Sequence, residues 1–232
     1  NEFSNLYASL FKNSQGHETI VKALAAKNKG LTRNEIVQAT GMKSGGGLSV
    51  LLEELIQCGF VKQIFPINKA KEDALYRLLD EYTLFYFKFL VNNKNNNSWL
   101  YLSNKQTYKI WSGYAFENLC FKHIFQIKKA LGINGIISNE YAWTMKSEAQ
   151  IDLLIDRDDN CINLLELKFY DGQYEVNKAY AAQLQEKVAI FKQNTRTKKN
   201  LFVTLLTVFG AKKNEHYLSS ITNEIVIEDL FK

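Results

Sequence analysis

The chain has 232 residues, of which 46% are hydrophobic and 23% are charged. This apolar content excludes an intrinsically disordered chain and suffices for one large core or two smaller ones. The three cysteines lie far apart and form no CxxC pair, which argues against a disulfide scaffold or a thiolate zinc site and favours a reducing cytoplasm. No stretch approaches the ~18 apolar residues of a membrane helix, so we expect no membrane partner. The net charge of +5 is compatible with a polyanionic partner.

The N-terminal part of the chain has the pattern of several helices followed by a β-hairpin. Apolar residues recur at helical spacing up to residue 55, and Thr32 with Glu35 has the spacing of a helix-capping box. Gly41 is placed to end that helix in the left-handed conformation. Strand-like segments follow at 60–65 and 74–78. Helices plus a two-stranded hairpin predict a winged helix-turn-helix over residues 1–92, closed by an aromatic helix.

A polar tract at residues 92–97 separates this pattern from a different one, and we expect the domain boundary there. The second domain would span residues 98–232. Its pattern predicts a long helix, three strands, a helix and a buried strand, in that order. The corresponding segments are 105–131, 136–143, 150–155, 162–169, 174–193 and 201–208, with one further strand near 221–227. The expected fold class is therefore mixed α/β or α+β.

Charged residues interrupt two of these apolar strands. Glu166 and Lys168 are two residues apart and must therefore project from one face of their strand. Asp152 lies in the preceding strand and falls near Glu166 if the two strands pair. Two close carboxylates repel each other unless a cation lies between them, and Mg²⁺ or Mn²⁺ prefers such oxygen ligands. A buried ion pair without catalytic function is the alternative, but burying three charges is rarely worthwhile for stability alone.

Asp152 and the Glu166-Leu167-Lys168 triplet, within a helix–strand–strand–strand–helix–strand order, resemble the PD-(D/E)XK superfamily of restriction-endonuclease-like proteins. Ile151 stands where the motif has proline. The resemblance implies an αβββαβ nuclease domain that hydrolyses phosphodiester bonds. Asp152 and Glu166 would be the metal ligands, Lys168 would be catalytic, and Glu117 would be an additional acidic residue from the first helix. It also implies that Gln183 or Lys187, on the following helix, supports the site.

The whole chain resembles the C-terminal portion of archaeal-type AAA+ ATPases, which also occur in bacteria. In that family a P-loop ATPase domain precedes the winged helix. Residues 41–47 have the glycines but not the order of a Walker A motif, so ATP would bind only to an upstream domain. Because the chain opens without methionine, we expect that upstream part to be missing. The resemblance implies a homo-oligomer formed through the ATPase part, in the cytoplasm that the cysteine pattern favours.

Basic side chains supply candidate contacts to a DNA backbone. The candidates are Arg33, Lys43, Lys62 and Lys69 in the first domain and Arg196, Lys198 and Lys199 in the second. Solvated surface charge is the alternative for each of them. For the whole chain we expect the DNA-processing part of an ATPase with a magnesium-dependent nuclease domain. The competing interpretation is a non-catalytic tail that binds DNA or protein and retains a nuclease-like fold.

Overall fold

The computed structural model describes residues 2–67, 73–91, 102–103, 105–145 and 149–232. The chain divides into two compact units, Asn1–Phe65 with Lys69–Tyr114 and Pro66–Asn68 with Ala115–Lys232. Both contain helices and strands, which agrees with the expected α+β class. The asparagine-rich tract at 92–97 lies outside the described residues, and the units divide further along the chain, inside a helix. Within the described ranges, no helix combines the length and the apolar character that crossing a membrane requires.

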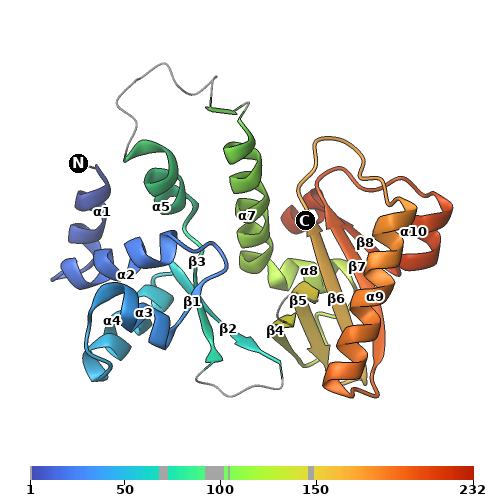
Figure 1. The fold of residues 1–232 in the computed structure, drawn as a ribbon, viewed down its shortest axis with the longest axis horizontal. Coiled ribbons are helices and arrows are strands. Elements are labelled where there is room, and N and C mark those ends of the chain that lie inside the picture. The colour runs from blue at the N-terminus through green and yellow to red at the C-terminus, as the bar shows by residue number, and fades with distance from the viewer. Residues whose placement is uncertain (1, 68–72, 92–101, 104, 146–148) are drawn as a thin grey trace. The chain divides into compact units, whose positions relative to one another are not determined.

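The first unit packs short helices against a small antiparallel sheet (Figure 1). Strand β3 pairs with both β1 and β2, so it lies in the middle of this sheet. The elements of the first unit are α1 (Glu2–Leu10), α2 (Gln15–Ala25), β1 (Leu31–Thr32), α3 (Arg33–Thr40), α4 (Gly46–Gln57), β2 (Val61–Pro66), β3 (Leu75–Leu78), α5 (Glu81–Phe85) and the π-helix η2 (Tyr86–Leu90).

Local sequence signals set both ends of α3. The Thr32 hydroxyl accepts a hydrogen bond from the Glu35 amide at 3.2 Å, and the Glu35 carboxylate accepts one from the Thr32 amide at 2.8 Å. Gly41 ends the helix at φ +69°, where a side chain would be strained. The predicted capping box and glycine stop are both confirmed.

The core of the first unit lies between these helices and the sheet. Ile20, Ile36 and Leu55, from three successive helices, are fully buried. Tyr7 is also fully buried, and its hydroxyl lies 3.0 Å from the Thr83 hydroxyl. Burial raises the pKa of Tyr7 well above its ordinary value, so the ring stays neutral. The hydrogen bond joins α1 to α5 across 76 residues of sequence.

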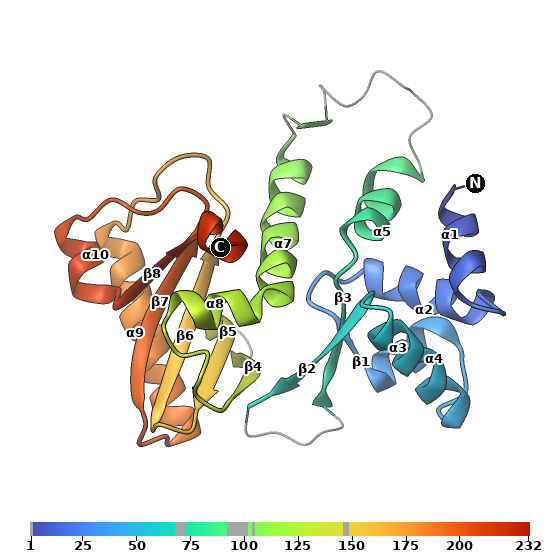
Figure 2. The same ribbon diagram turned by 180° about the vertical axis from the view of Figure 1, so that it is seen from behind.

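The second unit is built on the strand order β4-β5-β6-β7-β8. The β4–β5 and β5–β6 pairs are antiparallel, whereas β6–β7 and β7–β8 are parallel. Figures 1 and 2, which view the molecule from opposite sides, show α8 and α9 on opposite faces of this sheet. The elements of the second unit are α7 (Gln106–Lys122, which begins in the first unit), α8 (Ile124–Ala130), β4 (Ser138–Met145), β5 (Ala149–Arg157), β6 (Cys161–Lys168), α9 (Lys178–Thr195), β7 (Asn200–Thr207), α10 (Glu215–Ser220), β8 (Asn223–Val226) and the 3-10 helix η3 (Ile227–Phe231).

The predicted order of helix, three strands, helix and strand is present, with two differences in the helices. The expected single helix over 105–131 is interrupted at His123, whose backbone leaves the helical region at φ −109° and ψ 31°. One ring nitrogen of His123 lies 2.8 Å from the Leu119 carbonyl oxygen, where it competes for the backbone acceptor. Helix α10, capped by Asn214, was not predicted, because its six residues are too few to show a helical period.

The capping box makes a stability prediction for the first unit. Thr32→Ala removes the hydroxyl that accepts from the Glu35 amide, so we expect the free energy of unfolding to fall by about 1 kcal/mol. Urea denaturation followed by circular dichroism measures the change. Thr19→Ala is the matched control, because the Thr19 hydroxyl donates back to the Gln15 carbonyl of its own helix, α2. An equal loss in both variants would show that the box adds no stability.

Candidate functional site

An irregularity in β5 positions Asp152. Tyr141 pairs with Leu154 and Trp143 with Ile151, so β5 contains one more residue than β4 between these pairs. Such a bulge turns side chains away from regular alternation and is frequent beside active sites. The Asp152 carboxylate accepts a hydrogen bond from the backbone amide of Leu167 at 3.0 Å. The side chain of Asp152 is therefore fixed against β6 at the triplet that carries Glu166 and Lys168.

Glu166 is the centre of the polar contacts on β6. It is 2% exposed, and each of its carboxylate oxygens has a partner. Oε1 accepts a hydrogen bond from Lys187 Nζ at 2.7 Å, and Oε2 accepts one from the Tyr180 hydroxyl at 3.0 Å. Lys168 Nζ lies 3.4 Å from Oε2, as expected of side chains on one face of a strand. We call Asp152, Glu166, Lys168, Tyr180 and Lys187 the acid–lysine cluster.

Burial and neighbouring charges strongly perturb the cluster. Burial, followed by the charges of Glu166 and Glu117, raises the pKa of Asp152 to about 6. Burial alone would lower the pKa of Lys168, but Glu166 and Asp152 raise it above its ordinary value. Burial and the charge of Glu166 also raise the pKa of the Tyr180 hydroxyl, which therefore remains a hydrogen-bond donor. Perturbed groups concentrated in one place are typical of functional sites.

The residues predicted to form this site come together to different degrees. Glu117 on α7 is close enough for its charge to raise the pKa of Asp152. Lys187, expected beside the site, contacts Glu166 directly, whereas the Gln183 side chain is exposed on α9. Sequence reasoning missed Tyr180, which binds Glu166 from the first turn of α9. Its seven-residue spacing from Lys187, two helical turns on one face, was the available signal.

The donor atoms suit a hard divalent cation. Asp152 and Glu166 offer carboxylate oxygens, and the raised pKa of Asp152 shows that its negative charge lacks full compensation. Against this, Lys187 and Tyr180 already occupy both oxygens of Glu166, so a cation there would have to displace one of them. No group of three or more His, Cys, Asp or Glu side chains among the described residues has the geometry of a metal site. Asp152 and Glu166 therefore match magnesium in donor chemistry but do not by themselves form a complete metal site.

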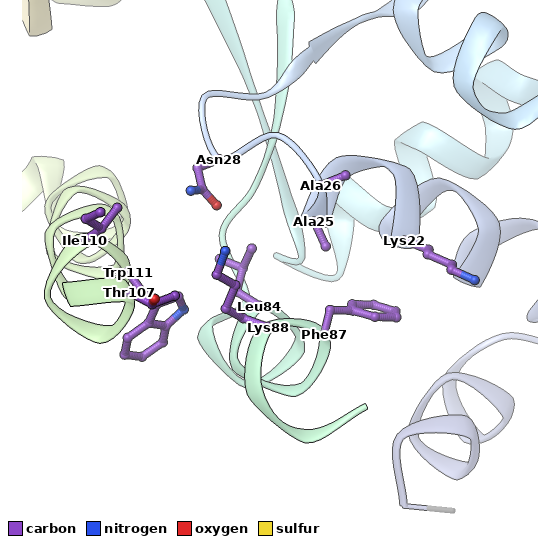
Figure 3. Close-up of a pocket in the computed structure, with 10 residues that line it drawn as sticks. All are labelled: Lys22, Ala25, Ala26, Asn28, Leu84, Phe87, Lys88, Thr107, Ile110 and Trp111. Carbon is purple, nitrogen blue, oxygen red and sulfur yellow. The ribbon is translucent and has the colours of Figure 1, made fainter. Parts of the chain in front are cut away.

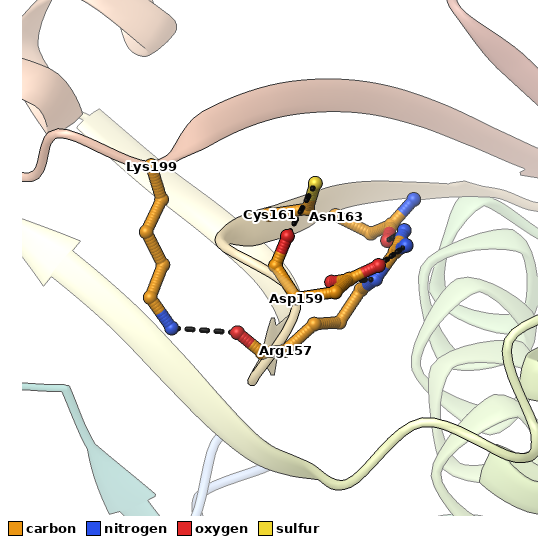
Figure 4. A network of polar contacts seen from close by, with 5 residues as sticks. All are labelled: Arg157, Asp159, Cys161, Asn163 and Lys199. Atoms are coloured by element: carbon orange, nitrogen blue, oxygen red, sulfur yellow. Dashed lines mark hydrogen bonds and ion pairs between the residues drawn. The ribbon is translucent and has the colours of Figure 1, made fainter.

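The basic residues of the second unit differ in how freely they could meet phosphate. Arg196 and Lys198 are exposed in the connection between α9 and β7. Lys199 is not available in the same way, because its ammonium donates to Asp156 Oδ1 and to the Arg157 carbonyl, both at 2.7 Å. Figure 4 shows the contact between Lys199 and the Arg157 carbonyl.

The Arg157 guanidinium donates to the Asp159 carboxylate and to Asn163 Oδ1, the latter at 3.1 Å. Asn160, between Asp159 and Asn163 in the chain, adopts the left-handed conformation at φ +64°. Short polar side chains tolerate that conformation better than most others. The network, together with Lys199, therefore holds the turn between β5 and β6.

The basic residues of the first unit lie in different surroundings. The Arg33 guanidinium donates to the Gly45 carbonyl at 2.9 Å and to the Ser49 hydroxyl at 3.0 Å, which ties α3 to the start of α4. Lys43 is exposed in the connection between these helices, and Lys62 is half-buried on β2. Lys69 lies outside the described residues.

A separate cavity lies within the first unit. Its volume is about 370 Å³, and Figure 3 shows Ile110 and Trp111 of α7 facing Leu84 and Lys88 across it. The buried indole nitrogen of Trp111 has no hydrogen-bond partner in the part of the chain that the structure describes. No member of the acid–lysine cluster lines this cavity.

The raised pKa of Asp152 predicts how stability changes with pH. The folded protein holds the Asp152 proton more tightly than the unfolded chain, whose aspartates titrate near ~3.9. Ionisation of Asp152 therefore destabilises the folded protein. This destabilisation grows between pH ~4 and ~6 and is complete above pH ~6. Asp152→Asn keeps an acceptor for the Leu167 amide, so we expect it to stabilise the protein by up to ~3 kcal/mol at pH 7.5 and by little at pH 4. Urea denaturation at both pH values measures this difference.

Asp158→Asn, on an exposed side chain of the same hairpin, is the control for the substitution itself. A stability change in Asp152→Asn that does not vary with pH would contradict an ionised, poorly compensated Asp152.

The comparisons with known proteins add no identification. No family model matches the chain, and neither the curated proteins nor the solved structures that were searched gave a match.

Proposed function

We propose that the chain hydrolyses phosphodiester bonds of nucleic acid in a divalent-metal-dependent reaction at the acid–lysine cluster. The observation that carries the proposal is the meeting of Asp152, Glu166 and Lys168 on adjoining strands, with Glu166 buried and Asp152 half-buried. Burying charges of this kind stabilises a fold poorly, which favours a functional reason for them. The finer fold assignment belongs to the same proposal, with a winged helix in the first unit and a restriction-endonuclease-like domain in the second.

The chain's own residues have separate roles in this proposal. Asp152 and Glu166 would hold the cation, and Glu117 would add negative charge beside Asp152. When bound, a magnesium ion polarises a phosphate oxygen and acidifies a water molecule. Lys168 keeps its proton, because the neighbouring carboxylates favour the ammonium form. Lys168 Nζ therefore stabilises charge on the phosphate instead of removing a proton from water.

One observation favours a second candidate function. Both oxygens of Glu166 already accept hydrogen bonds, from Lys187 and Tyr180, so the cluster also satisfies itself without a metal ion. A non-catalytic module that binds DNA or protein, with the cluster as a structural ion network, has this property. The two candidates differ in whether a divalent ion binds at Asp152 and Glu166.

Cleavage distinguishes a catalytic cluster from a structural one. We expect magnesium-dependent cleavage of a labelled oligonucleotide, with Asp152→Ala reducing its rate at least ~100-fold and Lys168→Ala by about 100- to 1,000-fold. A gel assay with Mg²⁺ and with EDTA measures both rates. Asp158→Ala, an exposed carboxylate on the β5–β6 turn, is the matched control and should cleave normally. Undiminished cleavage by Asp152→Ala would remove the assignment.

Metal binding tests the same site without a substrate. We expect Mn²⁺ to bind to the wild-type chain in calorimetry and to release protons at pH 6, because Asp152 is partly protonated there. Asp152→Asn and Glu166→Gln should each lose this binding. If Mn²⁺ binds equally well to both variants, or to none of the three proteins, the second candidate function is favoured.

A further inference from the structure

Exposed aromatic side chains gather where β6 and β7 end. Phe169 and Tyr170 directly follow β6 and are 50% and 52% exposed, and Phe209 follows β7 and is 57% exposed. Single exposed hydrophobic residues are ordinary on protein surfaces, whereas contiguous ones mark binding sites. We call these three residues the aromatic edge.

The parallel pairing of the strands brings the aromatic edge together. Lys168 pairs with Thr207, so the residues that follow β6 and β7 emerge at the same end of the sheet. The Tyr174 amide donates a hydrogen bond to the Gly210 carbonyl at 2.8 Å, and the Tyr174 ring lies 5.9 Å from the Tyr170 ring. Tyr170 and the chain around Phe209 are thus linked through Tyr174.

The aromatic edge adjoins the acid–lysine cluster directly. Phe169 follows Lys168 in the chain, and its ring lies 5.9 Å from that of Phe116, which precedes Glu117. On the other side, the Tyr174 ring lies 5.6 Å from Tyr180, the residue that binds Glu166. Phe169 and Tyr170 are thus one and two residues from Lys168 in the chain. A ligand bound to them lies beside the candidate catalytic groups.

We propose that the aromatic edge stacks with unpaired bases, so that the substrate of the cluster is single-stranded nucleic acid or an unpaired stretch. This rests on the proposed function. Bases in a duplex stack on each other and hide their faces, whereas an exposed ring can stack with any base that is free of its partner. Aromatic rings beside a cationic group are the combination that binds single strands, and Lys168 supplies that group.

Charge complementarity favours nucleic acid over a protein as the occupant. Lys212 follows Phe209 closely, and both side chains of its ion pair with Glu175 are more than half exposed. Exposed ion pairs contribute little stability, so a phosphate can replace the carboxylate in them at small cost.

The test compares binding of single and double strands by the complete chain. Fluorescence anisotropy would be recorded with a labelled oligothymidylate of about 15 nucleotides and with a duplex of the same length, in EDTA so that no cleavage occurs. We expect tighter binding of the oligothymidylate. Tyr170→Leu and Phe209→Leu keep an apolar side chain but remove the ring, and each should weaken that binding by roughly five- to a hundredfold. Tyr170→Phe should bind normally.

Phe125→Leu is the matched control, because Phe125 is 64% exposed on α8 of the same unit. It should bind as the wild-type chain does. Equal affinity for single strand and duplex, no binding of either, or an equal loss in Phe125→Leu would each overturn the proposal.

The outcomes separate this inference from the proposed function. Cleavage that depends on Asp152 but is equally fast on single strand and duplex keeps the proposed function and overturns the inference. The other outcome is binding of the oligothymidylate that requires the rings of Tyr170 and Phe209, with no cleavage in Mg²⁺. That result would support the role of the aromatic edge and overturn the proposed function.

Discussion

The burial of Glu166 constrains the second unit more than any other single feature. A carboxylate this deep in a sheet costs several kcal/mol unless other groups replace its lost water. Lys187 and Tyr180 supply those contacts from α9, and Lys168 adds a charge from the same strand. Because the two α9 side chains lie two turns apart, they set both the rotation and the position of that helix along β6. The same two contacts therefore compensate the charge of Glu166 and position α9 on the sheet.

The same contacts limit what the cluster can do. Every donor that stabilises Glu166 is also a competitor for a metal ion at its oxygens. Asp152 is less well compensated. Burial and the neighbouring carboxylates raise its pKa to about 6, and Lys168 and the Leu167 amide offset this in part. One carboxylate is well compensated and the other poorly, and the bulge in β5 fixes the second beside the first. This asymmetry distinguishes the cluster from a simple ion pair and supports the proposed function.

The arrangement of strands explains why the aromatic edge and the cluster are neighbours. In open sheets of this kind, ligands commonly bind outside the carboxyl ends of parallel strands. Here Lys168 is the last residue of β6, and the segment after β7 returns to Tyr174 through hydrogen bonds on both sides of Ala211. The proposed catalytic residues and the aromatic edge thus share one end of the β6–β7 pair. The antiparallel β5–β6 turn lies at the other end of β6, where Arg157, Asn163 and Lys199 make structural contacts.

The sequence by itself determined the features that depend on near neighbours. The period of two places Glu166 and Lys168 on one face, and the Thr32–Glu35 spacing specifies the start of α3. Only the tertiary structure decided which distant groups meet. Tyr180 and Lys187 reach Glu166 from another element, and Lys199 and Arg33 bind carbonyls instead of remaining free for phosphate. The reason is physical: a local period fixes the direction of a side chain, whereas its partner depends on how two elements pack.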